Sequence, residues 1–311
     1  MEPYGLGRPI GALAAIAVLL VATALPGVAR EVDDDTRRAA VVSAFAPEMS
    51  VLRNALEGAS VRSVNGVEFV TGRLEGRDVV LFLSGISVVN AAMTVQLALD
   101  RFHIDRILFS GIAGGVDPGL NIGDVVIADR WGQYLELLLA RESDDGWSKT
   151  PFFEYPFGNF GMMFPRSITV MRAGLEAPET RFWFPVEEAL LDGARRTAAE
   201  ASLERCTAEN ACLEHTPRIV IGGPGVSGGA FVDNAAFRAW TFETFGARVL
   251  DMESAAVAHV AWANGVPFIA VRSLSDLAGG SEQGNQLEVF LRLAAGNAAA
   301  VVKALLRAMP E

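Results

Sequence analysis

The sequence predicts a three-layer α/β/α fold, in which helices cover both faces of a central mixed, mostly parallel sheet. Short apolar runs rich in β-branched residues alternate along the chain with segments whose apolar residues recur at helical spacing. Strands that alternate with helices form a mostly parallel sheet that is covered on both faces. The 311 residues are 51% hydrophobic, which allows a substantial core and excludes disorder, collagen and coiled coil.

The charge balance narrows the class of partner. The chain has 26 Lys and Arg against 37 Asp and Glu, a formal net charge of −11. An acidic protein gains no electrostatic attraction to a polyphosphate, so we expect no nucleic-acid partner. The expected ligand is instead small and close to neutral.

The first thirty residues are typical of an export signal. Residues 10–29 are apolar and uncharged, and they end in Gly27-Val28-Ala29, whose small residues suit a signal peptidase. We therefore expect a signal peptide over residues 1–29, a polar leader over 30–38 and one domain over 39–311. The protein would be periplasmic or secreted, with no membrane contact after cleavage. The apolar stretch is also long enough to span a bilayer, so a retained anchor stays open as an alternative.

The first half of the domain predicts strands and helices in alternation. An apolar run at residues 39–45 predicts the first strand, and residues 47–56 predict a helix after it. Residues 67–72 and 79–83 are rich in β-branched residues and flank Glu75-Gly76-Arg77, which predicts a hairpin. A helix over 87–102 and strands over 107–110 and 125–128 follow. The helix is predicted because apolar residues fall on one side of it, at Val88, Ala91, Ala92, Val95 and Leu99.

The second half continues the alternation after one irregular stretch. Residues 133–180 are rich in aromatic residues and glycine, with weak periodicity, and predict a long insertion or a lid. Beyond it we expect helices over 186–199, 234–245, 254–264 and 287–308, and strands over 218–222 and 266–272, the last one buried.

Two cysteines, Cys206 and Cys212, are all that the chain has, with five residues between them. Oxidising compartments preserve disulfides, so the predicted export favours a Cys206–Cys212 bond. A zinc site is not expected, because two sulfurs and His215 do not complete a ligand set. We expect neither a metal nor a cofactor.

Three acidic residues are expected to meet at one edge of the sheet. Ligands of such folds lie beyond the carboxyl ends of the strands. Glu48 and Asp276 each follow a predicted strand, and Glu253 directly precedes the predicted helix at 254–264. Glycine-rich turns after other strands would let the backbone approach a ligand closely. Each signal alone has an ordinary explanation: the three acids suit helix termini or turns, and Phe231 suits a core.

The order of the motifs is more specific than any one of them. The series is AFAPEM, SGI, SGIAGG-x-x-P-x-L-x-x-GDVV, SGGAFV, LDMESAA and RSLSDLA. Over about residues 39–308, apart from the insertion, it closely resembles the nucleoside phosphorylase/hydrolase superfamily. Among its branches the chain looks most like the 5′-methylthioadenosine/S-adenosylhomocysteine nucleosidases.

This resemblance implies roles for residues at matching positions. Asp276 would be the acid that protonates the departing purine, and Glu48 would orient the attacking water. Phe231 would stack on the purine, the backbone of Val232 would meet the base edge, and Met252 and Glu253 would hold the ribose. Further binding residues are expected in the same motifs, at Ile86, Gly114 and Ser275. The implied substrate is a purine nucleoside, and we expect a homodimer.

Hydrolysis is favoured over phosphorolysis. A phosphate dianion is normally bound by arginines and backbone amides near the glycine-rich turns. Here Phe109 precedes SGIAGG, and the turn after the first strand presents the carboxylate of Glu48. Two alternatives stay open: a phosphate-dependent purine nucleoside phosphorylase, and a non-catalytic exported nucleoside-binding or storage protein of the same fold.

Overall fold

The computed structural model of the chain describes residues 35–282 and 284–309. The predicted signal peptide over residues 1–29 and residues 30–34 of the predicted leader lie outside the described residues.

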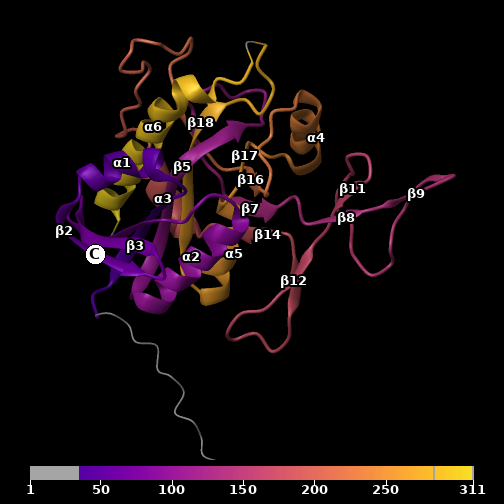
Figure 1. Cartoon of the computed structure of the whole chain (residues 1–311), viewed down its shortest axis with the longest axis horizontal. Helices are drawn as coiled ribbons and strands as arrows, with labels where there is room; N and C mark the ends of the chain where they lie inside the picture. The colour runs from indigo at the N-terminus through magenta and orange to yellow at the C-terminus, as the bar shows by residue number, and fades with distance from the viewer. Residues whose placement is uncertain (1–34, 283, 310–311) are drawn as a thin grey trace, which may run out of the picture. The chain divides into compact units, whose positions relative to one another are not determined.

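The centre of the molecule is a mixed sheet, as the sequence predicts (Figure 1). Strand β1 (Arg38–Ser43) runs parallel to β4 (Arg77–Leu83) on one side and to β5 (Ile104–Gly115) on the other. Strand β18 (Phe268–Asp276) runs parallel to β5 along most of its length. These four strands are apolar and largely buried, because helices cover them from both sides.

Shorter strands extend this centre in two directions. Within the described residues the sheet has twelve strands, and its main path is β14-β7-β16-β17-β5-β1-β4-β3-β2, with β6 pairing with both β18 and β15. The remaining bounds are β2 Glu57–Val64, β3 Val67–Leu74, β6 Val125–Ile127, β7 Arg130–Gln133, β14 Trp183–Pro185, β15 Ile219–Ile221, β16 Pro224–Ser227 and β17 Val249–Asp251.

Helices form the outer two layers. Helix α6 (Leu287–Ala308) packs against β18 and β5 together with α1 (Ala46–Asn54) and α3 (Glu188–Thr197). Helices α2 (Val88–Arg101) and α5 (Ser254–Asn264) pack together on the other face. The bounds of α5 and α6 are those predicted from the sequence. Of the described helices α6 is long and apolar enough to cross a membrane, but 67% of its apolar window is buried inside this fold.

Helix α4 (Ala235–Phe245) carries sequence signals at both ends. The side chain of Asn234 accepts a hydrogen bond from the N–H of Phe237 at 2.9 Å, which caps the first turn. Gly246 ends the helix at a φ of +61°, a left-handed conformation that favours glycine.

Several features differ from the sequence prediction, among them the short strands β7, β14, β16 and β17, which were not expected. The strand β2 was not expected, because its polar, exposed residues give no apolar alternation. The SGIAGG motif was expected to form a turn, but Ser110–Gly115 continue strand β5. Strand β18 likewise runs on past Arg272, so that Asp276 is its last residue.

The insertion is a set of short hairpins between β7 and β14, and it projects from the main sheet (Figure 1). Its two-stranded sheets explain the weak periodicity: β8 (Leu137–Leu139) with β11 (Met163–Pro165), β9 (Arg141–Ser143) with β10 (Gly146–Ser148), and β12 (Ile168–Val170) with β13 (Glu179–Arg181). At its base, aromatic rings from the insertion pack on α4, where Phe160 contacts Trp240 and Phe157 contacts Phe245.

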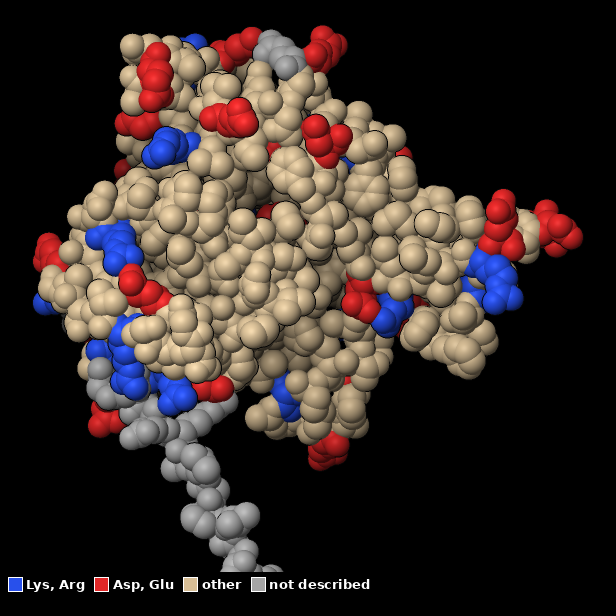
Figure 2. Space-filling model, viewed as in Figure 1, with Lys and Arg blue, Asp and Glu red and all other residues tan. Residues whose placement is uncertain are grey.

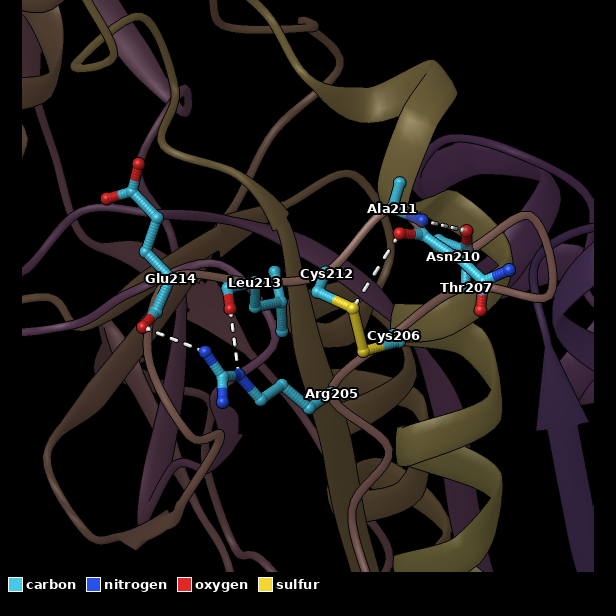
Figure 3. Close-up of a disulfide and its surroundings, with 8 residues drawn as sticks. All are labelled: Arg205, Cys206, Thr207, Asn210, Ala211, Cys212, Leu213 and Glu214. Carbon is cyan, nitrogen blue, oxygen red and sulfur yellow. Dashed lines mark hydrogen bonds between the residues drawn. A yellow bond between two sulfur atoms is a disulfide. The ribbon is translucent and has the colours of Figure 1, made fainter.

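Cys206 and Cys212 are joined in the structure (Figure 3). The two residues face each other across a small loop in which the N–H of Thr207 donates to the carbonyl of Ala211 at 2.8 Å. Just outside the bond, the backbone N–H of Leu213 donates to the carbonyl of Arg205 at 2.9 Å. The bond therefore closes a narrow, exposed loop between α3 and β15.

Candidate active site

All nine residues expected to act on or bind the substrate line one pocket of about 300 Å³: Glu48, Ile86, Gly114, Phe231, Val232, Met252, Glu253, Ser275 and Asp276. They come from six separate segments, most of them at the carboxyl ends of strands. Figure 2 shows acidic atoms at the bottom of a hollow near the centre of one face, surrounded by uncharged residues. The convergence predicted from chain order is therefore realised in the tertiary structure.

Glu48 is buried at the start of α1, where its carboxylate is held from two sides. Oε2 accepts the N–H groups of Ala44 at 2.7 Å and Phe45 at 3.4 Å, which caps the helix. Oε1 accepts the N–H of Ile112 from strand β5 at 2.9 Å. Burial raises the pKa of Glu48, while Arg272 and the three N–H groups oppose that rise.

Arg272 is the residue that sequence reasoning left without a role. It is fully buried on β18, and its guanidinium lies over the ring of Phe109, 4.0 Å from the ring centroid. Nη1 lies 4.0 Å from Oε1 of Glu48, and Nη2 lies 3.8 Å from Oε2 of Glu253. Among the described residues neither Nη1 nor Nη2 has a hydrogen-bond partner. These N–H groups thus lie between two carboxylates at the pocket.

Asp251 anchors this arginine and was also missed. Its Oδ2 lies 2.7 Å from Nε of Arg272 and accepts the hydroxyl of Ser254, and its Oδ1 accepts the hydroxyl of Ser227. Its Oδ1 accepts the N–H groups of Glu253 and Ser254, both at 3.1 Å. Asp251 therefore ties β16, β18 and the start of α5 together. The signal was present in LDMESAA, but the resemblance assigned roles only to the Met and Glu of that motif.

Glu253 stands at the N-terminus of α5 with its carboxylate turned to the pocket. Its Oε1 accepts the N–H of Ser87 at 2.8 Å. Burial raises the pKa of Glu253 to about 7, helped by the negative charge of Asp251 and opposed by Arg272. Three carboxylates thus surround one buried guanidinium, and Glu253 ionises only near neutral pH.

Asp276, the last residue of β18, also lines the pocket. Its Oδ1 accepts the N–H of Ala278 at 2.8 Å, so the alternative role in a turn is present as well. Its Oδ2 accepts the hydroxyl of Ser275 at 3.0 Å. Burial raises the pKa of Asp276 despite both hydrogen bonds, which favours a protonated carboxyl group.

The remaining lining is mostly apolar. Phe231 is 58% exposed, so it belongs to the mouth of the pocket and not to the core. Val232 is buried, Ile86 is half exposed, and Leu287 and Leu291 of α6 close the wall. Such a slot, with a carboxyl group at one side, suits a flat heterocycle.

The segment expected to be an insertion or a lid does not reach this pocket. No residue of 133–180 is among the described residues that line it. Within this segment, the side chain of Leu135 fills the space beside Gly228, which precedes the loop that carries Phe231. Within the described residues no group of three or more His, Cys, Asp or Glu side chains could hold a metal ion.

Comparisons with known proteins place the chain in a family. The model of the phosphorylase superfamily matches residues 38–307. A 5′-methylthioadenosine/S-adenosylhomocysteine nucleosidase of Geobacillus kaustophilus is 31% identical, covering 88% of this chain and 98% of that protein. The nucleosidase of the same name from Colwellia psychrerythraea, solved with adenine, is 25% identical with a TM-score of 0.65, covering 87% of this chain and 95% of that one.

A solved futalosine hydrolase of Helicobacter pylori shares the fold at a TM-score of 0.66 and 22% identity, covering 88% of this chain and 98% of its own. Proteins named for different nucleosides therefore share this architecture. The superfamily model spans nearly the whole described domain, and the curated relative matches over almost its full length. The chain belongs to the phosphorylase superfamily.

Proposed function

We propose that the protein is a nucleosidase that hydrolyses the N-ribosyl bond of 5′-methylthioadenosine- and S-adenosylhomocysteine-like nucleosides to free purine and sugar. The observation that carries this is the convergence of three carboxyl groups on one pocket. Asp276, whose pKa is raised by burial, lines it together with Glu48 and Glu253, which lie beside Arg272. The name shared by the similar curated proteins supports the same substrate class.

The residues divide the reaction between leaving group and nucleophile. Phe231 stacks on the purine, and the Asp276 carboxyl group donates its proton to the purine ring as the N-glycosidic bond breaks. The bonding electron pair leaves with the base, and positive charge develops on the sugar. Glu253, which accepts the ribose hydroxyl groups, places a carboxylate near that charge. Glu48 takes a proton from the attacking water, and Arg272 lies behind its carboxylate, with Nη1 4.0 Å from Oε1.

Water suits this site better than phosphate. The described residues that line the pocket include no Lys or Arg. Arg272, directly behind the lining, is already surrounded by Glu48, Asp251 and Glu253. The negative charge of these carboxylates would repel a phosphate dianion, whereas it would not repel a neutral water molecule.

There is space for a substituent on the sugar. Ala44, Phe45 and Ile86 line both the substrate pocket and an adjoining cavity of about 570 Å³. We propose that the 5′ substituent extends past Phe45 and Ile86 into this cavity.

We also propose that the protein acts outside the cytoplasm as a homodimer. Export is supported by the apolar segment at residues 10–29 and by the Cys206–Cys212 bond. Dimer formation is supported by α2, where Val89 and Met93 are 65% and 66% exposed beside a groove shared with α5. Light scattering should give twice the monomer mass, and a monomer at micromolar concentration would contradict the dimer.

Hydrolysis is tested by product analysis. We expect purine release from methylthioadenosine at the same rate with and without phosphate, with free sugar as the second product. Glu48→Gln should keep substrate binding and lower kcat by ~10²–10⁴-fold, because the amide accepts no proton from water. A sugar 1-phosphate as the main product would instead identify a phosphorylase, and binding without turnover in the unmodified protein would identify a storage protein.

The proton donor is tested with two leaving groups. Asp276→Asn keeps the shape of the side chain but cannot donate a carboxylic proton, so kcat on methylthioadenosine should fall by ~10²–10⁴-fold. A riboside of p-nitrophenol, whose leaving group needs no protonation, should be cleaved by this variant at close to the normal rate. If Asp276 only completes the turn at Ala278, Asn would serve as well and both rates would stay normal.

The pH profile follows from the two kinds of carboxyl group. As pH rises, kcat/KM for methylthioadenosine should increase with a midpoint near 7, where Glu253 loses its proton and becomes the required carboxylate. Loss of the Asp276 proton should lower the rate on methylthioadenosine, because Asp276 donates that proton; burial raises the pKa of Asp276 and so extends the pH range in which the proton is held. The p-nitrophenyl riboside should show the increase without the decrease, and a loss of rate at high pH on both substrates would contradict the assignment.

Processing and the disulfide can be tested on one sample. Protein recovered from the exported fraction should begin at Arg30, and its intact mass should be two hydrogens lower than after reduction. Protein that retains residues 1–29 would support an anchor, and two freely alkylated thiols would show that the bond does not form.

A further inference from the structure

We propose that the segment around the Cys206–Cys212 bond, here called the disulfide segment, positions the loop that carries Asp276. Leu213, which directly follows Cys212, is the positioning residue through which this segment acts. The role of Asp276 in this proposal rests on the proposed nucleosidase activity. The physical contact between the segment and the loop does not depend on that activity.

Leu213 is a buried residue in an exposed segment. Cys206, Cys212 and Glu214 are exposed, whereas Leu213 retains only 5% of its exposure. It packs in a small apolar cluster with Ile122 and Leu277, which also contains Phe290 and Leu293 of α6. This cluster is separate from the main core. Leu213 is therefore the point at which the segment is inserted into the body of the protein.

Two members of this cluster adjoin the pocket directly. Leu277 follows Asp276 in the chain, and the next residue, Ala278, donates its N–H to Oδ1 of Asp276. Phe290 lies beside Leu291, which lines the pocket wall. A shift of Leu213 would thus be transmitted to the turn that holds the carboxyl group.

A second contact leads to the same strand end. Gly123 has a φ of +88°, and a Cβ there would lie 2.3 Å from Cδ1 of Leu213, so the leucine packs directly on the backbone. The N–H of Gly123 donates to the carbonyl of Leu274 at 2.8 Å, and the N–H of Leu274 donates to the carbonyl of Asp124 at 2.8 Å. Leu274 is two residues before Asp276. Leu213 therefore supports Asp276 through residues on both sides of it in the chain, Leu274 before it and Leu277 after it.

The disulfide keeps Leu213 paired with Arg205. The N–H of Leu213 donates to the carbonyl of Arg205 at 2.9 Å. Nε of Arg205 donates in turn to the carbonyl of Leu213, also at 2.9 Å (Figure 3). Cys206 and Cys212 join the two strands of this pairing at the adjacent residues. Without the bond, the pairing of these exposed residues would depend on a few solvent-accessible hydrogen bonds.

The test compares Leu213→Ala with a matched truncation elsewhere. Leu74→Ala removes a buried leucine of strand β3 in the main core, so it creates a cavity without touching the cluster. We expect Leu213→Ala to lower kcat on methylthioadenosine ~10- to 100-fold with little change in KM, as a misplaced acid should. Cleavage of the p-nitrophenyl riboside should stay near normal. Leu74→Ala should change both rates by the same factor.

Two further measurements keep the outcome decisive. The double variant Cys206→Ser, Cys212→Ser leaves the cluster intact and should lower the methylthioadenosine rate in the same selective way, by a smaller factor. Hydrogen exchange without substrate should show faster exchange at Leu277 and Ala278 in both variants but not in Leu74→Ala. Unchanged exchange, or equal loss on both substrates, would overturn the proposal. Faster exchange in a protein that cleaves no nucleoside would instead overturn the proposed function and leave the structural coupling intact.

Discussion

The buried guanidinium of Arg272 organises the site. A charge without water around it must be paired, because the cost of removing it from solvent is otherwise several kcal/mol. Its partners come from two distant segments: Asp251 and Glu253 lie where β17 ends and α5 begins, and Glu48 lies in α1. Pairing with one cation therefore joins elements that are distant in the chain. It also leaves more negative than positive charge in the cluster, which is one reason why the pKa of Glu253 rises to about 7.

Close packing around this arginine explains the glycine-rich motif. At Gly111, a Cβ would lie 1.9 Å from Nη1 of Arg272 and 2.7 Å from Oε1 of Glu48. Gly111 thus lets strand β5 pass directly over the charge cluster, where the sequence suggested a turn. Phe109, just before the motif, supplies the aromatic face that covers the guanidinium.

Two parts of the chain lie outside the charge cluster around Arg272, and they differ in whether they contact the residues near the pocket. The insertion between β7 and β14 contributes no lining residue, and its aromatic base packs on α4. The disulfide segment is much shorter, yet its single buried leucine contacts the residues around the acid. The short disulfide segment therefore reaches the surroundings of Asp276 because one apolar side chain, Leu213, inserts there. The longer insertion lines no part of the pocket.

The sequence by itself determined the alternation of strands and helices and the exact bounds of α5 and α6, because apolar periodicity is a local signal. The ordered motifs, through the family that they resemble, also pointed to nine residues that line the pocket. The sequence did not determine the strand β2, whose polar residues have no local pattern, or the strand conformation of Ser110–Gly115, which depends on Arg272 beneath it. The roles of Arg272 and Asp251 were likewise decided by tertiary structure. A charged residue in an apolar strand has no meaning until its partners are known, and those partners meet only when distant strands pack together.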